Sequence, residues 1–138
     1  MTAGLGTQED PDEKEMANVA KERDAIKENA LKAYSFATHK AERGVLSANP
    51  VRLSLALNFS LFTCYCMGEL EQAAKMSQRA IVVAKKKIDQ VNDPEQKRDA
   101  DAILKLLEDN VKGWKLELFG PDGKGDPADV KKKTEEKK

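Results

Sequence analysis

Two asparagines lie among large apolar side chains in separate stretches of the chain, and their amides could bind the backbone of a peptide. Asn58 follows Leu57 in a leucine-rich segment, and Asn110 lies four residues before Trp114. An asparagine amide can pair with both the N–H and the C=O groups of an extended chain. Apolar neighbours would then hold the side chains of that chain. In the alternative interpretation, both asparagines cap local hydrogen bonds and Trp114 belongs to the core.

Residue types that commonly carry catalysis are scarce. His39 is the single histidine, and its neighbours Thr38, Lys40 and Glu42 indicate a solvent-facing helix position. The chain has no Glu-x-x-His pair for a di-metal site and no glycine-rich loop followed by a helix for a phosphate. We therefore expect no enzymatic activity, no metal site and no cofactor.

The two cysteines, Cys64 and Cys66, are two residues apart. On a helix this spacing points the side chains about 200° away from each other, so they cannot share a metal ion or a disulfide. No further cysteine is present to complete a zinc site. We expect two reduced, buried thiols.

The overall charge argues against nucleic acid and membrane partners. The chain has 24 basic and 24 acidic residues, so it has no global basic field. No stretch approaches the ~20 apolar residues of a membrane-spanning helix, and the N-terminus lacks the layout of a signal peptide. These features predict a cytoplasmic protein that binds neither nucleic acid nor membrane.

The segment from residue 50 to residue 62, PVRLSLALNFSLF, decides the fold. Its odd positions from Val51 to Leu61 are apolar, which is the period of a half-buried strand. However, no second strand-like run exists to pair with it, and an unpaired strand would leave its backbone groups unsatisfied. Pro50 suits the first turn of a helix. The segment is therefore predicted to be helical.

Helical periodicity and loop residues then give an all-α fold, an antiparallel four-helix bundle or array. The expected helices cover residues 14–46, 50–67, 69–91 and 95–118. The domain is expected to span residues 14–119, between an acidic, disordered tail at 1–13 and a second disordered tail at 120–138.

A helical wheel places two apolar stripes on the helix from residue 50. One stripe contains Val51, Leu55, Phe59 and Phe62, and the other contains Leu53, Leu57, Leu61 and Cys64. A helix that is apolar on two sides is covered on both or lines a groove with one of them. Ser54, Asn58, Leu61 and Tyr65 lie between the stripes, and the last helix places Ile103, Leu106, Asn110 and Trp114 on one face.

The segment from Asn49 to Phe62 closely resembles the most characteristic segment of the 14-3-3 family. The segment from Leu106 to Trp114, LLEDNVKGW, resembles that family's last helix, and Tyr34 fits without a gap. The similarity covers roughly residues 16–116 and corresponds to the C-terminal four helices of the family. The sequence is thus identified as a divergent, truncated member of the family.

The resemblance implies a non-catalytic adaptor that binds proteins or phosphopeptides in signalling. Asn58 and Asn110 would hold the peptide backbone. The apolar wall of the groove would consist of Leu57, Leu61, Ile103, Leu106 and Trp114, with Ser54 and Tyr65 at the groove edge. Because the other wall of the groove lies outside the match, the leucines of the second stripe are expected to be exposed and to invite a partner, either a second copy, a full-length 14-3-3 protein or a client.

Departures from the family pattern concern the phosphate. The family's Arg-Tyr pair falls at the acidic Asp12-Glu13, and a phosphate needs arginine or lysine donors. Tyr65 stands where the family has a groove glutamate, and Glu108 stands where it usually has arginine. We therefore expect recognition of phosphate to be weakened, or to rely on basic residues that another chain supplies.

Two alternatives remain open. One is a tetratricopeptide-like helical adaptor, suggested by the single helix pair at 57–81, and the other is a non-functional remnant of a 14-3-3 protein.

Overall fold

A computed structural model describes residues 12–121 of the chain. The chain divides between Ala33 and Tyr34 into two compact units. Residues 12–33 are the described part of the first unit, and residues 34–121 are the described part of the second. The expected tails fall mostly on residues 1–11 and 122–138, which lie outside the described residues.

The first helix, α1 (Glu13–Gly44), has the acidic residues Glu13 and Glu15 in its first turn, and it begins one residue earlier than predicted, at Glu13 of the expected tail. Asp12 caps the helix, since its Oδ1 atom accepts a hydrogen bond of 2.8 Å from the backbone N–H of Glu15. Negative charge in the first turn also interacts favourably with the helix dipole. Asp12 and Glu13 therefore have a structural role at this helix end, and α1 buries none of its residues.

The alternating segment forms the helix α2 (Pro50–Tyr65), as the sequence predicts. The side chain of Asn49 accepts a hydrogen bond of 2.8 Å from the backbone N–H of Val51, and Pro50 occupies the first turn, where its missing N–H costs nothing. Gly68, with a φ of +70°, reverses the chain after the helix in a conformation that favours glycine. Local capping thus overrides the period-2 pattern.

The expected third helix at 69–91 is two elements. The helix α3 (Leu70–Lys85) ends early, and a 3₁₀ turn, η2 (Ile88–Gln90), follows it. The break has a packing reason, because Ile88 packs against the core and Val91 is buried in it. The last helix is α4 (Pro94–Phe119). Within residues 12–121 every regular element is helical, which confirms the predicted all-α fold.

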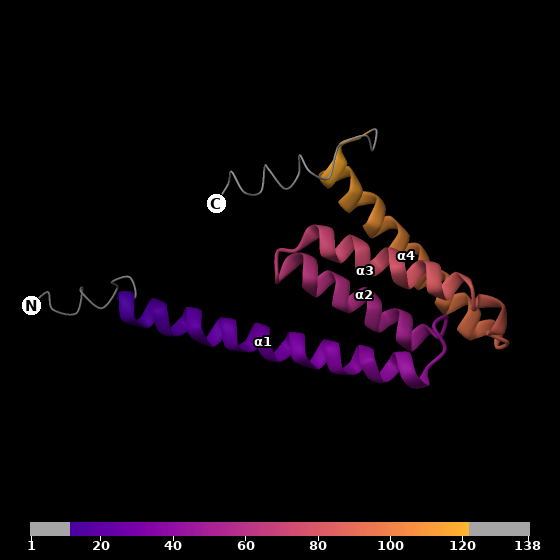
Figure 1. The fold of residues 1–138 in the computed structure, drawn as a ribbon, viewed down its shortest axis with the longest axis horizontal. Helices are drawn as coiled ribbons and strands as arrows, with labels where there is room; N and C mark the ends of the chain where they lie inside the picture. The colour runs from indigo at the N-terminus through magenta and orange to yellow at the C-terminus, as the bar shows by residue number, and fades with distance from the viewer. Residues whose placement is uncertain (1–11, 122–138) are drawn as a thin grey trace, which may run out of the picture. The chain divides into compact units, whose positions relative to one another are not determined.

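In the second unit, α2 and α3 run side by side in opposite directions, and α4 packs against both (Figure 1). The buried face of α3 consists mainly of small side chains, which lets its neighbours approach closely. These residues are Ala73, Ala74, Ser77, Ile81 and Ala84. A larger apolar cluster centred on Leu107 and a smaller one centred on Trp114 form the core of this unit.

Both apolar stripes of α2 are in contact with protein. Leu53, only 1% exposed, is buried in the cluster that α3 and α4 supply. On the other side, the ring of Tyr34 near the end of α1 stacks on Phe59 and lies tilted against Phe62, with both centroid distances at 5.1 Å. The helix is therefore covered on two faces over most of its length, whereas Val51 at the start of the first stripe stays exposed.

Candidate functional site

The open surface of α2 is a narrow line of three residues. Val51, Asn58 and Tyr65 are exposed, and the two end residues are 76% and 73% exposed. Their spacing of seven residues is close to two helical turns, so the side chains lie above one another. We call these three residues the α2 seam. Ser54, predicted at the groove edge, is half-buried.

The leucines beside the seam are partly covered. Leu57 packs against the larger core cluster, and Leu61 packs against the smaller one. Both are half-buried, and Leu53 of the same stripe is fully inside. The expectation that this whole stripe is exposed is therefore wrong, because α3 and α4 themselves supply its covering.

On α4 the predicted residues divide between surface and core. Leu106 is 51% exposed, whereas Ile103 and Asn110 are half-buried. Trp114 is only 4% exposed and packs with Ala73 and Ala74 of α3. The indole was predicted to line a groove wall, but it is instead buried beneath the surface of α4. A large aromatic ring buries more area against two alanines than any smaller residue could.

The two asparagine amides have free hydrogen-bonding capacity. Within residues 12–121 neither Asn58 nor Asn110 makes a side-chain hydrogen bond. The alternative in which both cap local bonds is therefore not what the geometry shows, although Trp114 does belong to the core. Each amide offers two donor hydrogens and one acceptor oxygen to a ligand.

The unusual Glu108 is engaged between helices. Its carboxylate forms an ion pair with Lys85, which joins α4 to α3. A carboxylate held there is turned to the neighbouring helix, so the departure from the family's arginine has a local structural explanation. Both side chains are partly exposed, and such a pair contributes at most about 1 kcal/mol.

Other reactive side chains form no catalytic arrangement. His39 is exposed, as predicted. Burial, together with the negative charge of Glu117, raises the pKa of the half-buried Cys64 thiol. Cys66 is exposed, so the prediction of two buried thiols is wrong for this residue, which lies at the end of α2. The described part of the chain contains no group of three potential metal ligands, and none of its helices has the length and apolarity to cross a membrane.

A cavity between the end of α1, α2 and α3 has no counterpart in the sequence analysis. Its polar lining includes Thr38, Arg52 and Arg79, which come from three different helices. Residues so far apart in the sequence give no common pattern. The one available signal was Arg52, a charged residue within the apolar run that begins α2.

The described residues thus define an all-helical array that carries free amides beside partly exposed apolar side chains. The sequence model of the 14-3-3 protein family matches residues 14–115, so the chain belongs to the 14-3-3 family.

Curated relatives agree with this assignment. The 14-3-3-like protein GF14 epsilon of Arabidopsis thaliana is 36% identical over 97 residues, which cover 70% of this chain and 38% of the relative. The 14-3-3 protein homolog of Encephalitozoon cuniculi is 34% identical over 110 residues, 77% of this chain and 42% of the relative. The 14-3-3 protein I of Plasmodium falciparum is 37% identical over 106 residues, 77% of this chain and 38% of the relative. The matched part is thus about two fifths of each relative's length.

Proposed function

We propose that the chain is a non-catalytic adaptor that binds an extended segment of a client protein across α2 and α4. Asn58 and Asn110 hold the backbone of this segment through their amides. The observation that carries the proposal is that neither amide makes a side-chain hydrogen bond within residues 12–121, and both amides lie on helices within the family match. Backbone hydrogen bonds would give affinity without demanding a particular client sequence.

Side chains of the client meet a surface that is only moderately apolar. The exposed part of Leu106 and the half-buried Leu57, Leu61 and Ile103 supply the aliphatic contacts. Tyr65 adds an aromatic ring at one end of the α2 seam. Because several of these residues are already packed against the core, we expect contacts with one or two client side chains rather than a deep pocket.

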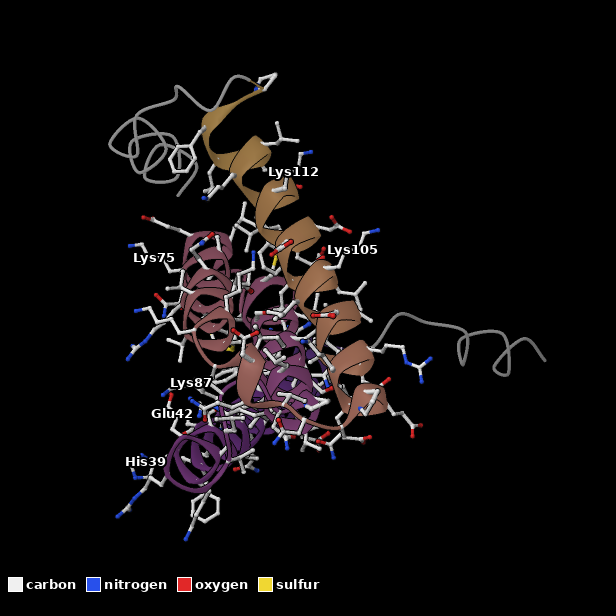
Figure 2. All side chains as sticks on the ribbon, turned by 90° about the vertical axis from the view of Figure 1, so that its right-hand side faces the viewer. His39, Glu42, Lys75, Lys87, Lys105 and Lys112 are labelled. Carbon is white, nitrogen blue, oxygen red and sulfur yellow. The ribbon has the colours of Figure 1, made fainter. Side chains whose placement is uncertain are left out.

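Dependence on phosphate is weak in this proposal, because no basic residue of α2 or α4 shares a face with the asparagines. At about 100° per residue, Arg52 lies roughly 120° around the helix from Asn58. Figure 2 shows Lys105 and Lys112 pointing outward from α4, and the same arithmetic places them at least roughly 120° from Asn110. Strong recognition of phosphate would therefore require donors from outside α2 and α4, and we propose that a second copy or a full-length 14-3-3 protein supplies them.

The test is fluorescence anisotropy with one labelled serine peptide, prepared with and without a phosphate. We expect the two affinities to agree within about threefold. Asn58→Ala and Asn110→Ala should each weaken binding by about threefold to tenfold, the effect of losing one or two hydrogen bonds. Asn92→Ala, in the loop before α4, is the matched control and should leave the affinity for the peptide unchanged.

Two outcomes would contradict the proposal. If both asparagine variants bind as tightly as the parent chain, the amides do not hold the peptide. If the phosphorylated peptide binds more than tenfold tighter, light scattering on the same sample decides the source of the donors. A dimer would assign them to a second copy, and a monomer would refute the weak dependence on phosphate.

We place this activity in the cytoplasm, where both cysteines can stay reduced.

A further inference from the structure

A cavity of about 390 Å³ lies between the end of α1, α2 and α3, within the second unit of the chain. This volume falls within the range of small-molecule sites in proteins, roughly 300 to 1,000 Å³. Its lining shares no residue with the proposed peptide site on α2 and α4. It is therefore a separate feature of the fold, and it does not depend on the proposed function.

The body of the cavity is apolar. Leu55 and Phe59 come from α2, and Met76 comes from α3. Ala41, Ala56 and Ala80, one from each of the three helices, leave the space that larger side chains would fill. Such a lining favours an aliphatic group.

One polar atom in the lining has no partner. The hydroxyl oxygen of Thr38 is inaccessible to solvent and forms no hydrogen bond within residues 12–121. Ser47, in the same lining, differs, because its hydroxyl donates to the backbone oxygen of Val83 at 3.1 Å. Buried hydroxyls without a partner are uncommon and destabilise the fold, so a ligand that bonds to Thr38 would remove a penalty.

The charges of the lining favour an anion. Arg52 and Arg79 outnumber the single acidic residue, Glu42, and neither arginine forms a salt bridge among the described residues. The Nη1 atom of Arg52 donates to the backbone oxygen of Val45 at 2.7 Å. This bond fixes the guanidinium, and its other N–H groups stay available, which suits the two-pronged binding of a carboxylate.

We propose that this cavity binds a small carboxylic acid with an aliphatic body. The carboxylate pairs with Arg52 and Arg79, and a rotation of the Thr38 side chain brings its covered hydroxyl to the carboxylate as a third donor. The aliphatic body occupies the space between Phe59, Met76 and the three alanines. A ligand there would contact three helices at once and would hold the end of α1 against α2 and α3.

The experiment is a methyl NMR titration of the full chain with octanoate. Chemical-shift changes at Met76 and at the three lining alanines should saturate at low millimolar concentration. Octan-1-ol has the same body without the charge, and acetate has the same charge without the body. Both should bind at least tenfold more weakly than octanoate, since octan-1-ol cannot pair with the arginines and acetate cannot fill the apolar space.

Two variants test the polar half of the site. Arg79→Gln removes an exposed cation and should weaken octanoate binding about tenfold, whereas Lys75→Gln, one helical turn earlier on α3, should leave it unchanged. Thr38→Val removes the unpaired hydroxyl and keeps the shape of the side chain. This variant should fold with an unchanged or raised melting temperature and should bind octanoate about threefold to tenfold more weakly.

A third variant tests the apolar half. Ala56→Leu should fill the cavity and abolish the octanoate-induced shifts. The proposal is overturned if octanoate fails to shift the lining methyl groups, if octan-1-ol or acetate binds as well as octanoate, or if Arg79→Gln binds like Lys75→Gln.

Discussion

Ser77 lies on the buried face of α3 with its side chain completely covered. Its hydroxyl oxygen forms no hydrogen bond within residues 12–121. Ser60, a buried serine of α2, differs, because its hydroxyl donates to the backbone oxygen of Leu57 at 2.8 Å. A buried hydroxyl without a partner loses its bonds to water and gains nothing in return. The unpaired hydroxyl of Ser77 therefore lowers the free energy of unfolding.

Ser77→Ala should stabilise the protein. The change removes the unpaired hydroxyl and introduces the best helix former, so the free energy of unfolding should rise by about 1 kcal/mol. Urea unfolding followed by the fluorescence of Trp114 measures it. Ser60→Ala is the matched control and should be neutral or slightly destabilising. A loss of stability in Ser77→Ala would show that the hydroxyl is in fact bonded.

At the scale of elements, the ring of Tyr34 connects α1 to α2. It contacts both Phe59 and Phe62, whereas Phe36 on the same helix is 65% exposed and lies against the ammonium group of Lys40. Aromatic pairs contribute about 0.5–1.5 kcal/mol beyond the area that they bury. The last turns of α1 thus depend on one aromatic side chain more than on any other.

Tyr34→Ala should therefore loosen the end of α1 while α2, α3 and α4 stay packed. Loss of the ring should cost about 2–4 kcal/mol of local stability, as large-to-small changes at packed aromatic positions do. Amide hydrogen exchange in residues 38–44 should become faster, and exchange around Leu107 should change little. Phe36→Ala is the control. Equal effects of the two substitutions would contradict the special role of Tyr34.

The elements that the sequence predicts well are those with strong local signals. Asn49 and Pro50 mark the start of α2, and Gly68 marks the turn after it, because caps and turns depend on a few adjacent residues. The early end of α3 was missed, since it depends on how Ile88 meets the core. Burial of Trp114 was one of two interpretations that the sequence left open, and the cavity at Thr38 was missed, because both depend on contacts between helices.

At the scale of the whole molecule, the residues before and after the division between Ala33 and Tyr34 differ in how much of their apolar surface is buried. Residues 13–33 of α1 bury no side chain, and Met16, Val19 and Ile26 are largely exposed. Residues 34–121 contain both apolar clusters. Most of the stability of a helix in a protein comes from tertiary packing of its apolar face, and residues 13–33 bury no side chain. Most of the folding free energy should therefore reside in the second unit.

A chain that begins at Tyr34 should consequently unfold at nearly the same temperature as the full chain. The single tryptophan, Trp114, reports on the second unit through its fluorescence. The midpoint should shift by less than about 4 °C, which corresponds to under 1 kcal/mol for a domain of this size. Circular dichroism should lose only the helical signal of the removed residues. A larger fall in the midpoint would show that residues before Tyr34 stabilise the core.

The α2 seam has a consequence for how new specificity can arise. Because α3, α4 and the end of α1 cover most of the other positions of α2, changes there disturb the fold before they change what the helix binds. Val51, Asn58 and Tyr65 can change size and charge without touching the core. A descendant or a designed variant could therefore acquire a different client by changing three positions, seven residues apart, and leave the architecture intact.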